Sequence, residues 1–177
     1  MINQALERRR ALVEASLSGL IALVLSLAVF GPILRWIAVG WSGGDMLSTY
    51  INVEMWQGFR YSASDQYGFP LGMNLNYFPG IDITENTFAA LVSTVAGTPF
   101  VGLNILILVT FPLVGFLAYF LFRMTGLTGP LAIAGAVVFS LIPFHFGRAL
   151  GHTYLATLYS AVTGMALVLL VGSGRFE

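Results

Sequence analysis

Residues 15–34 read ASLSGLIALVLSLAVFGPIL, without one charged side chain. An α-helix rises about 1.5 Å per residue, so about 20 apolar residues cross the ~30 Å hydrocarbon core of a bilayer. Three arginines at positions 8–10 precede the stretch, and Arg35 follows it. A cleavable signal peptide has a shorter apolar core that ends in a small-residue cleavage site. The sequence therefore predicts an uncleaved first transmembrane helix over residues 15–39.

The composition of the whole chain supports a membrane protein. Of its 177 residues, 57% are hydrophobic and 9% are charged, and the mean hydropathy is +0.84. Soluble domains carry about 25% charged residues. The formal net charge is zero, so the chain lacks the excess of basic residues that is typical of a nucleic-acid-binding protein. Cysteine is absent, which excludes disulfides and thiolate metal sites.

Three further stretches are long and apolar enough to be transmembrane helices. They cover residues 100–123, 130–146 and 153–172. Pro143 lies inside the second of these stretches. Because proline removes a helical hydrogen bond, we expect it to bend or end that helix just before His145.

The distribution of arginine predicts the orientation. Residues 1–14 carry three arginines, which favours a cytoplasmic N-terminus. If the helices cross in alternation, residues 40–99 and the short turn around Arg148 lie outside the cytoplasm. We therefore expect the chain to be integral to the plasma (inner) membrane, in contact with membrane lipids.

The first outer loop, defined by that orientation, holds five of the chain's eight acids and many aromatic residues. A loop of this length without structure of its own is atypical. Residues 46–60 predict a helix at the membrane interface. Its apolar face is formed by Leu47, Ile51 and Met55. Residues 85–96 predict a second short helix. The predicted fold is all-α: a polytopic membrane protein with about four transmembrane helices and two short interfacial helices.

Asp45 is the first candidate for chemistry. It follows Gly43 and Gly44 just beyond the first span, where glycines let the backbone turn and approach a ligand closely. A carboxylate there can act as a general base or bind a divalent cation. Asp45 can equally cap the helix that begins at Met46. The two roles are compatible, and the sequence does not choose between them.

Asp82 and Glu85 are the candidate supporting acids, three residues apart at the start of the second short helix. Together with Asp45 they could form an oxygen-ligand site for a hard cation. Their alternative role is to favour the helix N-terminus electrostatically.

His145, Arg148 and His152 lie near the second outer turn, on the side predicted for the acidic loop. The guanidinium fork of Arg148 suits phosphate, and either histidine could donate to it or transfer a proton. The alternative is interfacial anchoring, with Arg148 reaching the lipid head groups. Arg10 and Glu14 are expected at the opposite, cytoplasmic interface.

Three segments together resemble a known family. They are Gly44-Asp45 after the first span, YGFPLGMNLNYFP at 67–79 with Asp82 beyond it, and IPFHFGRALGH at 142–152. The pattern resembles the N-terminal part of bacterial GT-C type membrane glycosyltransferases, which are related to protein mannosyltransferases and aminoarabinose transferases. The resemblance spans roughly residues 15–172.

The resemblance implies an enzyme that takes a sugar from a lipid-linked donor, a polyprenyl-phosphate sugar, at the outer membrane face. It implies that Asp45 is the catalytic or metal-binding carboxylate and that Asp82 is a supporting acid or second metal ligand. Arg148, His145 and His152 are then expected at the donor phosphate. The implied cofactor is a divalent cation, Mg²⁺ or Mn²⁺. Enzymes of this family have more spans, so we expect remaining transmembrane helices or another membrane subunit as partners.

Two alternatives are not enzymes. A transporter or flippase segment would place polar groups and broken helices near the bilayer midplane. A membrane scaffold would pack through small residues such as Ala132, Gly135 and Ala136. The first alternative predicts uptake that depends on midplane polar residues, and the second predicts that substitutions of the loop acids have no effect.

Overall fold

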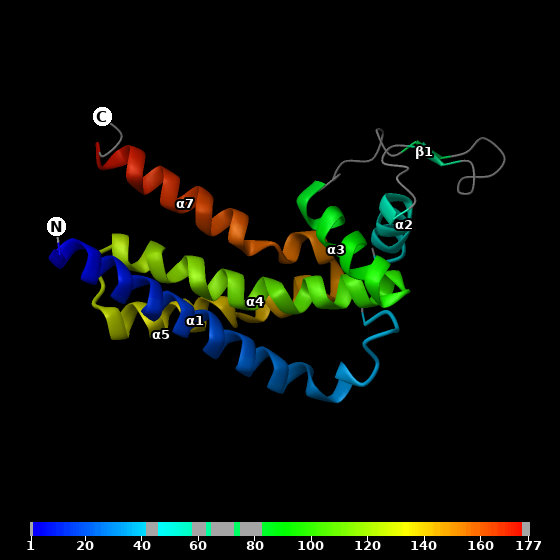
Figure 1. The fold of residues 1–177 in the computed structure, drawn as a ribbon, viewed down its shortest axis with the longest axis horizontal. Coiled ribbons are helices and arrows are strands. Elements are labelled where there is room, and N and C mark those ends of the chain that lie inside the picture. The colour runs from blue at the N-terminus through cyan, green and yellow to red at the C-terminus, as the bar shows by residue number, and fades with distance from the viewer. Residues whose placement is uncertain (1, 42–45, 58–62, 65–72, 75–82, 175–177) are drawn as a thin grey trace. The chain divides into compact units, whose positions relative to one another are not determined.

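The computed structural model describes residues 2–41, 46–57, 63–64, 73–74 and 83–174, and Figure 1 shows their fold. The described residues are almost entirely helical, which confirms the predicted class. One two-residue antiparallel pair, β1 with β2, is the exception among them, with Ala63 opposite Asn74. The elements are α1 (Ile2–Leu34), α2 (Met46–Gln57), β1 (Ala63–Ser64), β2 (Met73–Asn74), α3 (Ile83–Ala96), α4 (Pro99–Met124), α5 (Gly129–Ser140), α6 (Pro143–Gly151), a 3₁₀ turn (Thr153–Ala156) and α7 (Leu158–Gly172).

Among these residues, three helical stretches have the length and composition to cross a membrane: Gln4–Leu34, Pro99–Met124 and Gly129–Gly151. The protein is therefore a membrane protein with several apolar helices. The prediction of four spans is not confirmed. The stretch predicted as the fourth begins with the 3₁₀ turn Thr153–Ala156, and α7 keeps only 15 residues, fewer than a span of about 20 requires.

Two predicted boundaries change and one is confirmed. Helix α1 begins at Ile2, so the arginines at positions 8–10 belong to the same helix as the first span. Helix α3 begins at Ile83, two residues earlier than predicted. The break before His145 is confirmed, because α5 ends at Ser140 and α6 begins at Pro143. Proline has no amide hydrogen to continue the ladder of α5.

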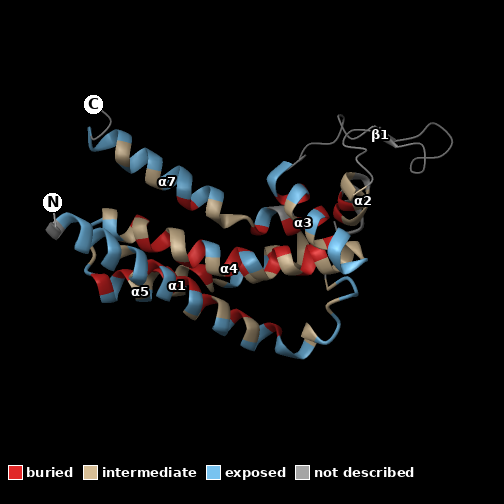
Figure 2. Ribbon diagram, viewed as in Figure 1, coloured by how far each residue is buried: buried red, intermediate tan, exposed pale blue. Residues whose placement is uncertain are grey.

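The chain forms two compact units. The first unit comprises Met1–Pro32, Leu108–Phe146 and Thr157–Glu177, and the second comprises Ile33–Ile107 and Gly147–Ala156. Both α4 and α6 contribute residues to both units. Each unit has a buried core of its own, drawn in red in Figure 2.

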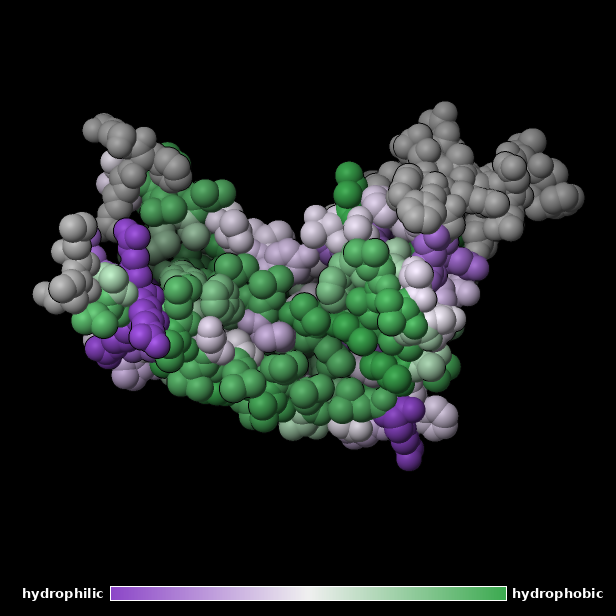
Figure 3. Space-filling view, viewed as in Figure 1, coloured by the Kyte–Doolittle hydropathy of each residue, from purple (hydrophilic) through white to green (hydrophobic). Residues whose placement is uncertain are grey.

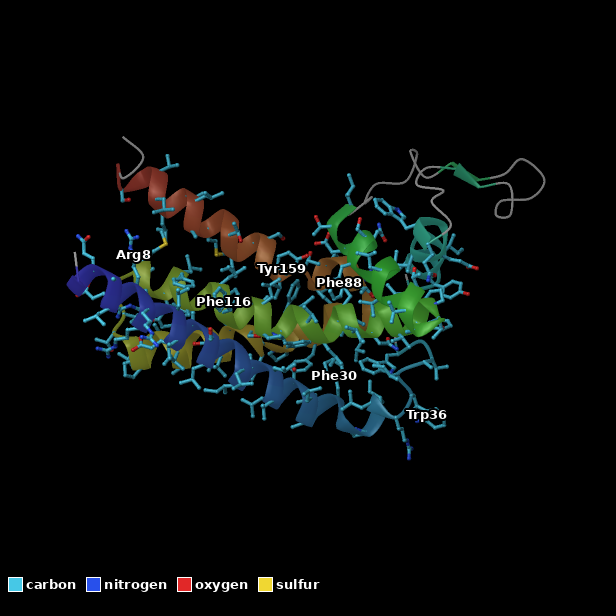
Figure 4. The ribbon with its side chains drawn as sticks, viewed as in Figure 1. Arg8, Phe30, Trp36, Phe88, Phe116 and Tyr159 are labelled. Carbon is cyan, nitrogen blue, oxygen red and sulfur yellow. The ribbon has the colours of Figure 1, made fainter. Side chains whose placement is uncertain are left out.

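The first unit is held together by close helix packing through small residues. A Cβ added to Gly115 of α4 would lie 3.0 Å from the Cβ of Ala22 and 3.1 Å from the carbonyl oxygen of Ser18, both on α1. A Cβ on Gly19 would lie 2.8 Å from the carbonyl oxygen of Pro112. Small residues allow this approach and gain dispersion contacts where lipid provides no hydrophobic drive. Phe30, labelled in Figure 4, lies farther along α1. Its ring packs edge-on against that of Phe111, with ring centroids 5.6 Å apart.

The second unit is centred on the packing of α2 and α3. Val53 and Ala89 are fully buried there, and Tyr50 stacks on Phe100 at 4.7 Å. Of the residues predicted to form the apolar face of α2, Ile51 is half-buried, and the side chains of Leu47 and Met55 lie outside the described part of the structure. Val53 and Trp56 contribute to the core, and Ile51 does not.

Candidate functional site

The predicted site residues fall into three groups. Glu85, Arg148 and His152 belong to the second unit, and His145 belongs to the first. Asp45 and Asp82 lie outside the described residues, so their predicted roles stay predictions. The structure thus brings one predicted acid and two predicted basic residues into one compact unit, although they come from distant parts of the sequence.

Glu85 is buried in the first turn of α3, with only 7% of its surface exposed. The helix dipole favours a carboxylate at that place, as the alternative interpretation of the sequence expected. A carboxylate whose only role is a favourable interaction with the helix dipole can remain exposed to solvent. Burial of a carboxylate costs free energy unless polar partners compensate. Asn86, its neighbour, is fully buried as well, so the start of α3 is a polar centre inside the second unit.

Asn104 is a site residue that sequence analysis missed. It is fully buried on α4, and its Nδ2 donates to the carbonyl oxygens of Ile37 at 2.8 Å and Val39 at 2.7 Å. These bonds hold the chain between α1 and Asp45. The Oδ1 atom is buried without a hydrogen-bond partner in the described part of the chain. The available signal was a lone amide inside an apolar span, which by default indicates a polar contact between helices.

Tyr50 is a neutral polar group in the same unit. Burial, and secondly the negative charge of Glu54, raise the pKa of its phenol above the ordinary value. The phenol therefore keeps its proton across the physiological range and can act as a hydrogen-bond donor.

His145 lies in a closed network where α5 breaks from α6. Its Nδ1 lies 2.7 Å from the carbonyl oxygen of Ser140, and since a carbonyl only accepts, Nδ1 carries the hydrogen. Its Nε2 lies 3.0 Å from the Thr110 hydroxyl, and its ring stacks on Phe111 at 4.0 Å. The side chain is fully buried.

This network changes what His145 can do. The imidazole satisfies a carbonyl at the end of α5, and the Ser140 hydroxyl donates to the carbonyl oxygen of Phe111 at 2.7 Å. Broken helices persist in membranes where such groups are satisfied inside the protein. Both ring nitrogens are engaged, so contact with a donor phosphate would require one of these bonds to break. The predicted phosphate contact has no support from this geometry, and a structural role does.

Glu14 forms a second network in the first unit, at the end where α1 begins. Its carboxylate accepts from the Tyr119 hydroxyl at 2.5 Å and from Arg10 Nε at 2.8 Å. A Cβ added to Gly129, the first residue of α5, would collide with the same carboxylate. The side chain of Glu14 is 17% exposed against 76% for Arg10. Glu14 therefore turns inward and joins three helices, whereas Arg10 reaches outward as expected.

A metal centre is not evident in the described part of the chain, which holds no group of three or more His, Cys, Asp or Glu side chains suited to an ion. Asp45 and Asp82, the predicted ligands, lie outside that part. Comparison with protein families, with curated proteins and with solved structures finds no match for this chain. The family suggested by the sequence pattern is therefore an expectation, and the function is argued from the residues.

Proposed function

We propose that this chain is the N-terminal membrane module of an inverting glycosyltransferase that moves a sugar from a polyprenyl-phosphate donor to an acceptor at the outer membrane face. One observation carries the proposal. Glu85, a buried acid, belongs to the same compact unit as Arg148 and His152. A polyprenyl-phosphate sugar needs cationic donors for its phosphate, and Glu85 is proposed as the supporting acid in the same unit.

Asp45 takes the central role in the reaction. Its carboxylate removes the proton of the acceptor hydroxyl, and the acceptor oxygen attacks the anomeric carbon of the sugar. The bond from that carbon to the phosphate oxygen breaks as the new bond forms, and polyprenyl phosphate leaves with the electron pair. A divalent cation held by the carboxylates of Asp45 and Asp82 would neutralise part of the phosphate charge, and such oxygens suit Mg²⁺ or Mn²⁺.

Arg148 and His152 stabilise the leaving group. The guanidinium fork of Arg148 can bind two phosphate oxygens, and a histidine N–H can bind a third. Preorganised donors aimed at developing charge supply about 10²- to 10³-fold in rate each. Glu85 assists as the supporting acid. Asn104 holds the chain that precedes Asp45 and so contributes to its position.

The direct test is transfer by the protein reconstituted in vesicles. The donors are radiolabelled polyprenyl-phosphate mannose and polyprenyl-phosphate aminoarabinose, with a membrane extract as the source of acceptor. We expect label to move from one donor to the acceptor fraction, and removal of divalent cations to reduce transfer if Asp45 acts through a cation. Cleavage of neither donor, by vesicles whose protein is folded, would contradict the proposal.

A further inference from the structure

The turn at residues 35–41, which follows α1, has a hydrogen-bonded backbone. Trp36 and Ile37 each donate a backbone N–H to the carbonyl oxygen three residues earlier, at 2.8 and 3.1 Å, and Val39 donates to that of Trp36 at 2.9 Å. Asn104 of α4 donates to the carbonyl oxygens of Ile37 and Val39. The indole of Trp41 donates to the carbonyl oxygen of Trp36 at 3.0 Å. All of these residues belong to the second unit.

This pairing indicates where the turn lies. A turn in bulk water does not need such partners, because water supplies donors to exposed carbonyl groups. The edge of the hydrocarbon core supplies few donors, so the backbone there must be satisfied inside the protein. The hydrogen bonds from Asn104 and Trp41 therefore favour a position at the boundary of the membrane over one in bulk water.

The exposed side chains of the turn combine a cation with an amphipathic ring. Trp36 is 54% exposed, and the guanidinium carbon of the exposed Arg35 lies 5.3 Å from the centre of its ring, within the range of a cation–π contact. Figure 3 shows a strongly hydrophilic projection beside apolar surface where α1 ends, and Figure 4 labels Trp36 there. Within the described part of the chain, Arg35 forms no ion pair, so its charge is available to an external anion.

The chemistry of this end of α1 matches the layers of a phospholipid leaflet. Residues 15–34 carry no charge, as the hydrocarbon core requires. Tryptophan is enriched at the level of the head groups, and a long arginine side chain can reach the phosphates. A partner protein would have to offer an acid beside an apolar surface at this place, whereas every phospholipid offers a phosphate above its acyl chains.

We infer that the turn at residues 35–41 is an interfacial anchor that binds the head-group layer of the bilayer. The guanidinium of Arg35 binds lipid phosphate, and the indole of Trp36 lies beside it at the level of the glycerol groups. The hydrogen bonds from Asn104 and Trp41 hold the turn in the shape that presents both side chains. The inference does not depend on the proposed transfer reaction, nor on which side of the membrane this end of α1 lies.

The experiment measures the depth of a spin label in vesicles of phosphatidylcholine with either short or long acyl chains. Since the chain has no cysteine, the exposed Ala38 can be replaced with cysteine and labelled at that position alone. Accessibility to oxygen, which concentrates in hydrocarbon, and to a water-soluble nickel complex together give the depth. We expect the label to stay in the head-group layer, about 5–8 Å thick on each side, in both kinds of vesicle.

Arg35→Gln together with Trp36→Leu removes the anchor from the labelled protein. We expect the label to leave the head-group layer in the thicker bilayer, because a span without interfacial anchors shifts when the hydrocarbon thickness changes. Arg35→Lys together with Trp36→Tyr is the matched control at the same two positions. Lysine and tyrosine are interfacial anchors as well, so this control should keep the label in the layer.

Three results would overturn the inference. A label fully accessible to the nickel complex would place the turn in water, and a label shielded from both reagents would place it in a protein interface. An equal depth with and without Arg35→Gln and Trp36→Leu would show that the fold sets the depth without the anchor. Circular dichroism checks that each variant is folded. If the double variant does not fold, the exposed Arg35→Gln variant alone decides the outcome.

Discussion

Replacing Asp45 with asparagine is expected to lower transfer from a polyprenyl-phosphate sugar by about 10²- to 10⁴-fold, because the amide cannot take the proton of the acceptor hydroxyl. The rate of label transfer in vesicles measures the effect. Asparagine caps a helix about as well as aspartate does. The substitution therefore preserves a capping role and removes a catalytic one, which separates the two roles that the sequence leaves open.

Asp65→Asn is the matched control, since it makes the same chemical change at another acid of the first outer loop. It should leave transfer within about twofold of the unchanged protein, because the proposed reaction gives Asp65 no role. Undiminished transfer by the Asp45 variant would remove Asp45 from the reaction and leave it as a cap.

His145→Phe is expected to lower the free energy of unfolding by about 1–3 kcal/mol, because the carbonyl of Ser140 loses a buried donor. Phenylalanine keeps a ring that can stack on Phe111. The change therefore isolates the two hydrogen bonds from the packing. Thermal unfolding in detergent, followed by circular dichroism, measures the loss.

His152→Phe supplies the comparison. The same replacement at this half-buried position should reduce transfer, because His152 is proposed at the donor phosphate. If the two variants exchange these effects, with His145→Phe stable and inactive, then the closed network around His145 is not its main role.

The transmembrane helices were largely predictable because their signal is local. A long apolar stretch without charge is typical of a membrane-spanning helix. The predicted C-terminal ends of the first two spans agree within a few residues with the ends of α1 and α4. The stop at Pro143 was predictable for the same reason, since proline acts on its own helix. The start of α1 at Ile2 was not, because a polar segment can continue a helix without an apolar signal.

The length of α7 and the packed face of α2 depended on contacts far away in sequence. Residues 153–156 are as acceptable in a helix as in a turn, and the chain forms the 3₁₀ turn. In α2, Val53 enters the core with Ala89 and Ala90 of α3. Periodicity reports which residues are apolar, and it does not report which side the partner helix covers.

The candidate site was predictable in its residue types and less so in its contacts. Glu85 was chosen as a carboxylate that could share a cation with Asp82, and Arg148 as an ionisable group near membrane depth. The same reasoning selected His145, whose two ring nitrogens are engaged inside the protein. The sequence predicted an interfacial role for Glu14 and gave no role to Asn104. The hydrogen bonds of Glu14 with Tyr119 and of Asn104 with Ile37 join segments that are far apart in the sequence, so the local pattern does not predict them.

The central claim is that the first outer loop and the segment around Arg148 lie on one side of the membrane and share one ligand. Since the chain has no cysteine, spin labels can be attached at Asp45→Cys and Arg148→Cys without other changes, and double electron–electron resonance in vesicles then measures their separation. We predict a separation well below the ~30 Å thickness of the hydrocarbon core. A separation of about 30 Å or more, as expected for opposite faces of the bilayer, would contradict the account.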